Sequence, residues 1–160
     1  MEAAKPYAGF APFSAEEKRR RIAEHESASD YFRLLGLRLL DLEPGFARMG
    51  LPFRQEMTHS GGVVQGGLIT TLADSCIAHA TVAALDGATQ RTATIELKIN
   101  FIRPATGRMF TASARLIHLG RRMAVGEAEV TDERGRLIAK CLSSVMVLPR
   151  SGEDALAAPD

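Results

Sequence analysis

The residues best suited to chemistry are a glycine pair and one acid within residues 59–85. Gly66 and Gly67 open a run that is rich in Ala and Leu and contains no Pro and no further Gly before Gly87. The run therefore predicts one helix of about five turns, roughly 30 Å long. The first amides of a helix have no intrahelical acceptor, so these could hold a carbonyl oxygen that becomes an oxyanion during acyl transfer.

Asp74 is the only formally charged residue of this apolar helix. A carboxylate there is costly to bury, which indicates either a nucleophile or the base that activates water; a carboxylate merely satisfied by Thr70, Thr71 or Ser75 is the alternative. Asp74 lies eight residues beyond Gly66, which is about 12 Å along a helix axis. One helix cannot bring both groups to one carbonyl carbon. We therefore expect a symmetric dimer in which the glycine end of one chain meets the acid of the other.

This stretch resembles the active-site segment of hotdog-fold acyl-CoA thioesterases of the phenylacetate-pathway (PaaI-like) type. Their pattern is Asn, six residues later His-Gly-Gly, and then an acidic residue in the central helix. Here Gln65 stands at the His position before Gly66 and Gly67, Asp74 stands at the acidic position, and His59 falls at the Asn position. The resemblance covers roughly residues 36–149. It implies catalytic roles for Gly66 and Asp74 and adds Gln65 and His59 as catalytic candidates, although an amide cannot shuttle a proton.

The clearest predicted strand is residues 92–101, in which polar and apolar residues alternate. Within it, Thr94 stands where related thioesterases often carry a hydroxyl residue that helps to orient water. Alternation puts Thr94 on the face opposite Ile95 and Leu97. Thr94 can therefore serve a site only if a bulge turns it or if it faces another subunit.

Three arginines are candidate ligands for the phosphates of coenzyme A, because Arg103, Arg121 and Arg122 stand at predicted strand ends where a guanidinium group can meet phosphate. Each can equally be an ordinary surface arginine. Gly67 is a further candidate for substrate binding, since glycine lets a ligand approach the backbone closely. His79 is interpreted as a core histidine. The four histidines include no pair at metal-ligand spacing, so we expect no metal and no cofactor other than the coenzyme A of the substrate.

The elements that position these residues are predicted from capping residues, turns and hydrophobic periodicity. Ser14 with Glu17 begins a helix over 14–26, and Ser27 with Asp30 repeats this signature before a short helix that Gly36 closes. The expected strands are 37–42, 46–53, 92–101, 109–119, 123–131 and 137–148. A strand pair, a long apolar helix and a four-strand meander predict an α+β hotdog fold, in which one curled antiparallel sheet wraps one central helix.

Composition places these elements in one domain of residues 14–149, between a flexible arm of residues 1–13 and a disordered tail of residues 150–160. The net charge of +1 and the absence of Trp argue against a nucleic acid or membrane partner. Cys76 and Cys141 are interpreted as reduced core cysteines. Because no apolar signal segment is present and Asp74 interrupts the one membrane-length run, we expect a cytoplasmic protein.

The leading hypothesis is an acyl-CoA thioesterase that hydrolyses an acyl- or aryl-CoA to free acid and coenzyme A, as a homodimer or a dimer of dimers. A hydratase or dehydratase on the same fold is an alternative, and it requires an Asp and a His placed together. A non-catalytic acyl-CoA binding protein is the other alternative. Gln65 in place of the usual His favours it.

Overall fold

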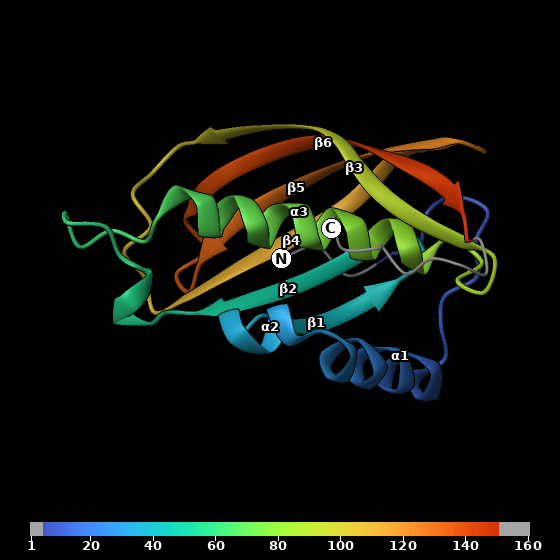
Figure 1. The fold of residues 1–160 in the computed structure, drawn as a ribbon, viewed down its shortest axis with the longest axis horizontal. Helices are drawn as coiled ribbons and strands as arrows, with labels where there is room; N and C mark the ends of the chain where they lie inside the picture. Colours follow the sequence, from blue (N-terminus) through green and yellow to red (C-terminus); the bar gives the residue numbers. More distant parts are fainter. Residues whose placement is uncertain (1–4, 151–160) are drawn as a thin grey trace, which may run out of the picture.

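The computed structural model describes residues 5–150, apart from the side chains of residues 25–28. In chain order the elements are α1 (Ala15–Ala28), α2 (Asp30–Leu35), β1 (Arg38–Glu43), β2 (Phe46–Pro52), the 3₁₀ turn η1 (Gln55–Met57), α3 (Gly66–Ala83), β3 (Gln90–Phe101), β4 (Met109–Leu119), β5 (Met123–Asp132) and β6 (Leu137–Pro149). The strands form one antiparallel sheet in the order β1-β2-β4-β5-β6-β3, which curls around α3 (Figure 1). The predicted hotdog fold is confirmed. No helix of the described residues is both long and apolar enough to cross a membrane.

The inner face of α3 packs against the concave side of the sheet and supplies much of the core. Gly126 on β5 allows the close approach, because a Cβ there would lie 2.7 Å from Cγ2 of Ile77. The buried helix residues that share this face include Ile69, Leu72, Ala73, Cys76, Ile77 and Ala80. A strip on the opposite side, formed by Gly67, Thr71, Asp74 and Ala78, remains exposed or half-buried. The helix is therefore wrapped on most sides, as expected, and its one open strip contains the acid.

β3 forms one edge of the sheet, and among the described strands it pairs with β6 alone. The pairing register shifts between Thr94 and Glu96, so Ile95 is an extra residue in a β-bulge. Beyond the bulge Leu97 packs against the core, whereas Ile95 is 52% exposed. The bulge turns Thr94 to the side of the sheet that faces α3. Of the two alternatives for Thr94, the bulge is confirmed.

The two N-terminal helices are capped by serine hydroxyl groups. Ser14 accepts a hydrogen bond from the amide of Glu17 at 3.1 Å, as predicted. α2 is capped by Ser29 and not by the predicted Ser27, and Ser29 accepts from the amide of Phe32 at 3.3 Å. The prediction was wrong because α1 continues through Ser27, so the chain first becomes extended at Ser29.

Contacts to the β1–β2 turn hold the segment before α1. The amide of Tyr7 donates to the carbonyl oxygen of Pro44 at 2.7 Å, and the amide of Phe13 donates to Glu43 at 2.8 Å. The buried Glu43 carboxylate also pairs with Lys18 of α1 at 2.6 Å. These contacts fix residues 7–18 against the sheet. Residues 1–4 of the predicted arm and residues 151–160 of the predicted tail lie outside the described residues.

Candidate active site

Asp74 is half-buried on the open strip of α3, and its side-chain partner comes from β3. The Thr94 hydroxyl donates to Oδ1 of Asp74 at 2.8 Å, across 20 residues of sequence. The nearby hydroxyl of Thr70 instead donates to the carbonyl oxygen of Gly66 at 3.0 Å. Asp74 therefore has a specific partner on another element, and its second oxygen, Oδ2, is left to accept from a water molecule or to reach a substrate.

Cys141 on β6 lies close to this acid but is not suited to be a nucleophile. Its burial, together with the nearby negative charges of Asp74 and Glu96, raises the pKa of the Cys141 thiol to about 11. At neutral pH the thiol is protonated, and the thiolate is the nucleophilic form. Asp74 therefore remains the candidate nucleophile or base of this region.

The N-terminus of α3 presents the glycine amides. Gln65 occupies the N-cap position with an exposed side chain that makes no capping hydrogen bond. The amides of Gly66 and Gly67 begin the helix and therefore have no intrahelical acceptor. A Cβ on Gly67 would meet no atom within 4 Å, so packing within the chain does not require glycine there. A Cβ on Gly66 would lie 3.1 Å from the ring of Phe101.

A hollow of about 420 Å³ opens beside this helix end. Apart from Gly66, its walls are mostly apolar, and two basic residues complete the lining: His59 and Arg103. Nδ1 of His59 accepts from the amide of Gly61 at 3.0 Å, so in the neutral ring the proton is on Nε2. Arg103 donates through Nη1 to the carbonyl oxygen of Leu137 at 2.8 Å, which holds the guanidinium group at the hollow.

The predicted site residues fall into three places within one chain. Gly66, His59 and Arg103 lie at the hollow, next to Gln65 and Gly67, while Asp74 and Thr94 meet two helical turns further along α3. Arg121 and Arg122 are exposed in the β4–β5 turn. This turn is near the start of β3, because Arg122 accepts from the amide of Val147 and Val147 pairs with Thr92. A single chain therefore does not bring Arg121 and Arg122 to Gly66.

The histidines do not form an acid–base pair with Asp74. His79 is buried and its Nδ1 lies 2.7 Å from the carbonyl oxygen of Ser75, which agrees with its interpretation as a core histidine. The recorded side-chain partner of Asp74 is Thr94 and not a histidine. This geometry gives the hydratase alternative no support. Among the side chains that the structure describes, no three of His, Cys, Asp or Glu gather where they could hold a metal ion.

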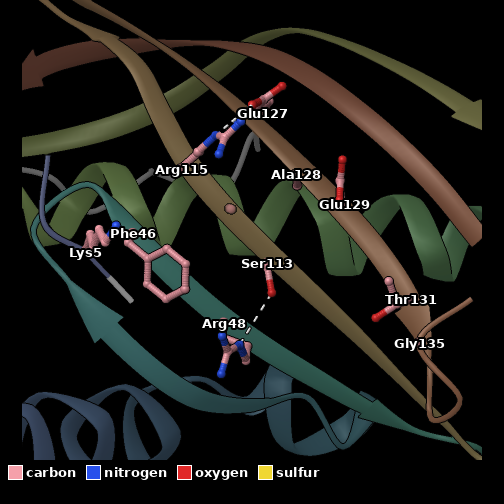
Figure 2. A pocket seen from close by; sticks show the side chains of 11 residues that line it. Lys5, Phe46, Arg48, Ser113, Arg115, Glu127, Ala128, Glu129, Thr131 and Gly135 are labelled. Carbon is pink, nitrogen blue, oxygen red and sulfur yellow. Dashed lines mark hydrogen bonds and ion pairs between the residues drawn. The ribbon is translucent and has the colours of Figure 1, made fainter. Parts of the chain in front are cut away.

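A second hollow, of about 400 Å³, lies on the outer face of the sheet and is lined by none of the predicted site residues. Polar side chains that line it bond to one another (Figure 2): Arg115 donates to Glu127 at 2.7 Å, and Arg48 donates to the Ser113 hydroxyl at 3.4 Å. It is separated from Asp74 by the sheet. We therefore assign the candidate active site to the side of β3 that faces α3.

Phe101 is the residue of this region that the sequence analysis missed as part of a site. It was interpreted only as an apolar position in an alternating strand, yet it lines the hollow and touches Gly66. The signal that could have found Phe101 is its position as the last residue of the strand. An apolar residue at a strand end can follow the alternating pattern without being buried in the core.

Comparisons with known proteins agree with this fold. The thioesterase superfamily model matches residues 61–139. A "putative esterase" of Saccharolobus solfataricus is 33% identical over 123 residues, covering 77% of this chain and 86% of that protein. The medium/long-chain acyl-CoA thioesterase YigI of Salmonella typhimurium is 29% identical over 130 residues, covering 72% and 83%. The PaaI protein of the E. coli phenylacetic acid degradation operon shares the fold, with a TM-score of 0.75 at 21% identity over 84% of this chain and 96% of that one. The chain therefore belongs to the thioesterase superfamily, as a thioester hydrolase with the hotdog fold that PaaI shares.

Proposed function

We propose that the protein hydrolyses an acyl-CoA thioester to the free acid and coenzyme A, at two equal sites that each combine Gly66 of one subunit with Asp74 of the other. The observation that carries the proposal is the bond between Asp74 and Thr94 on β3, about 12 Å along α3 from the free amides at Gly66. The acyl-CoA substrate named for YigI supports coenzyme A as the thiol part of the substrate.

The edge of β3 is the surface through which we propose that two subunits pair. Its outer edge has no strand beside it within the described chain, and an unpaired edge of 12 residues readily pairs with another strand. The large apolar side chains of Ile95 and Phe101 are 52% and 54% exposed along this strand. A second copy that pairs antiparallel would cover the edge and both side chains.

The contacts of β3 with α3 favour one register for this pairing. Gly66 touches Phe101, and Asp74 bonds Thr94. Gly66 therefore meets Asp74 of the partner subunit when Phe101 lies opposite Thr94 of the partner subunit. The bulge residue Ile95 is not counted in the pairing, so Lys98 is midway between Thr94 and Phe101. In this register Lys98 therefore lies opposite Lys98 of the partner subunit, on the two-fold axis.

The same antiparallel arrangement offers a common phosphate site for the three arginines. Arg103 follows the end of β3, whereas Arg121 and Arg122 lie near its start. Two-fold pairing brings the start of one strand alongside the end of the other. Arg103 of one subunit and Arg121 and Arg122 of the partner subunit would then lie at one end of the dimer, where the phosphates of coenzyme A can bind.

The proposed reaction uses these groups in the ordinary order of acyl transfer. The backbone amide of Gly66 polarises the thioester carbonyl and stabilises the oxyanion, with the exposed side-chain amide of Gln65 as a second donor. Asp74 either attacks the carbonyl carbon or takes a proton from the water that does, while Thr94 holds its other oxygen. The carbon–sulfur bond breaks, and the coenzyme A thiolate leaves and takes the proton that Asp74 removed from the water, or a proton from solvent. If Asp74 itself attacks, water then hydrolyses the acyl–Asp74 anhydride, which releases the free acid and restores the carboxylate. No cofactor takes part.

A panel of acyl- and aryl-CoA thioesters tests the proposal directly. The protein should release free thiol from members of the panel, and Asp74→Asn should lower kcat by about a hundredfold to ten-thousandfold, the usual share of an acid or base group. Light scattering should show the variant still dimeric. Equal turnover by Asp74→Asn, or no turnover of any thioester by the wild type, would sink the proposal.

A further inference from the structure

Tyr31 on the short helix α2 reaches the open strip of α3, the strip that contains the candidate acid. Its ring is 49% exposed, and its hydroxyl donates to Oγ1 of Thr71 at 3.3 Å, across 40 residues of sequence. The next residue holds α2 in place, because the ring of Phe32 lies 5.2 Å from the ring of His79 and packs against the core. The phenol group is therefore brought to Thr71 by a helix that is itself docked on α3.

α2 and β3 contact two different rows of residues on α3. Gly66 and Asp74, eight residues apart, contact β3. Thr71 and His79, also eight residues apart, contact α2. Rows of this kind run along adjoining sides of a helix. Because α2 lies away from β3, the pairing of two copies of β3 leaves the contact between Tyr31 and Thr71 in place.

Thr71 and Asp74 are neighbours on the open strip, since residues three apart in a helix have Cβ atoms about 5–6 Å apart. One water molecule that bonds to a side-chain oxygen at each end spans about this distance. Both residues are half-buried, so water can reach them. Thr94 occupies Oδ1 of Asp74, which leaves Oδ2 for this water. Tyr31 donates to the oxygen of Thr71, which leaves the Thr71 hydroxyl proton to be donated.

We propose that Thr71 and Asp74 hold between them the water molecule that attacks the thioester, and that Tyr31 is a positioning residue that acts through Thr71. The inference rests on the proposed function, in the form in which Asp74 is the base. The Thr71 hydroxyl donates to the water oxygen, and the water donates to Oδ2. When the water oxygen bonds to the carbonyl carbon, its proton passes to Asp74 and then to the departing thiolate. Thr71 and Tyr31 neither gain nor lose a proton.

Kinetics of single variants on an acyl-CoA thioester test the two roles. Thr71→Val keeps the branched shape and removes the hydroxyl, so kcat should fall by about tenfold to a hundredfold because the water is misplaced. Tyr31→Phe keeps the ring and should lower kcat by about twofold to tenfold, the effect of one neutral hydrogen bond. KM should stay near the wild-type value in both variants. Thr71→Ser keeps the hydroxyl and should restore kcat.

The double variant distinguishes positioning from a structural role of Tyr31. Tyr31→Phe combined with Thr71→Val should have the kcat of Thr71→Val alone, because Tyr31 acts only through Thr71. Losses that multiply would show that Tyr31 serves the packing of α2 and would overturn its positioning role. Tyr7→Phe is the matched control, since Tyr7 is the other tyrosine of the chain and lies before α1. It should keep the wild-type kcat.

The same assay separates failure of this inference from failure of the proposed function. Loss of turnover in Asp74→Asn together with wild-type kcat in Thr71→Val and Tyr31→Phe would overturn the inference and leave the proposed function standing. Wild-type turnover in Asp74→Asn, or no turnover of any thioester by the wild type, would overturn both.

Discussion

The Thr94 hydroxyl donates to Oδ1 of Asp74 at 2.8 Å, and this bond joins the central helix to the edge strand of the sheet. It exists because the bulge at Ile95 turns Thr94 toward α3. The bond fixes the rotation of the carboxylate and leaves Oδ2 available. The candidate acid is thereby held next to the strand that we propose as the subunit boundary.

Replacing Thr94 by Val should lower kcat while leaving the fold intact. Val keeps the branched shape that suits a strand but removes the donor, so the carboxylate is no longer held in one orientation. We expect kcat to fall by about a hundredfold at most, the usual penalty for a misplaced group. Thr94→Ser keeps the hydroxyl and should remain near wild type. Equal kcat values for the two variants would contradict the positioning role.

Gly67→Ala should stabilise the protein and impair it. A Cβ at this position meets no atom within 4 Å, and alanine is the better helix former. Chemical denaturation should therefore show a free energy of unfolding higher by about 0.5 kcal/mol. If substrate approaches this backbone closely, kcat/KM should fall at the same time. Unchanged kcat/KM would remove Gly67 from the substrate-binding residues.

The two cysteines should be unreactive in the folded protein at pH 8. Burial raises the pKa of Cys76 to about 12, and burial with the negative charges of Asp74 and Glu96 raises the pKa of Cys141 to about 11. Both thiols should react with a disulfide reagent only on unfolding. Above pH 9 the unfolded chain loses these protons while the folded chain keeps them, so the free energy of unfolding should fall as the pH rises. Rapid labelling of the native protein would contradict these shifts.

The register proposed for the β3 pair can be tested with one introduced cysteine. Lys98 lies on the outer face of β3, beside Leu142 of β6, and opposite itself in the proposed dimer. Directly opposed residues have Cα atoms about 4.5–5.5 Å apart, within the range of a disulfide. Lys98→Cys should therefore form a cross-linked dimer on oxidation. The control Glu96→Cys should not, because its two copies would be about 13 Å apart along the strands. Preferential cross-linking of Glu96→Cys would show a different register.

Local signals predicted the elements well because turns and caps are written in neighbouring residues. Pro44 and Gly45 mark the β1–β2 turn, and Gly45 adopts the positive φ of 78° that such a turn favours. Ser29 was missed as a cap because Ser27, and not Ser29, is followed three residues later by an acid. Only the continuation of α1 through Ser27 shows that Ser29 is the cap.

The candidate site was less predictable because it depends on distant parts of the chain. Gly66 and Asp74 could be found, since their spacing along one helix is local. The bulge that turns Thr94 is a matter of register with β6, which alternation alone cannot decide. The contact of Phe101 with Gly66 joins residues that are far apart in sequence. Likewise, the strand order was needed to show that Arg121 lies far from Arg103.

The two variants needed to test a shared site should both fold. Gly66→Pro deletes the proposed oxyanion amide at the first position of α3, where proline is tolerated. Gln65 before it already has φ −57° and ψ 130°, a conformation that residues before proline favour. Gly66→Ala is the matched control, because it adds the same crowding against Phe101 but keeps the amide. Asp74→Asn supplies the second defect.

Mixing the two inactive variants tests the central claim, that each site combines Gly66 of one subunit with Asp74 of the other. After subunit exchange, about half of the dimers are mixed. In each mixed dimer one site contains both defects and the other contains neither. Thioester hydrolysis by an equal mixture of Gly66→Pro and Asp74→Asn should therefore recover to about a quarter of the wild-type rate. A mixture with verified exchange that stays as inactive as its parents would show that Asp74 acts within its own chain or not at all.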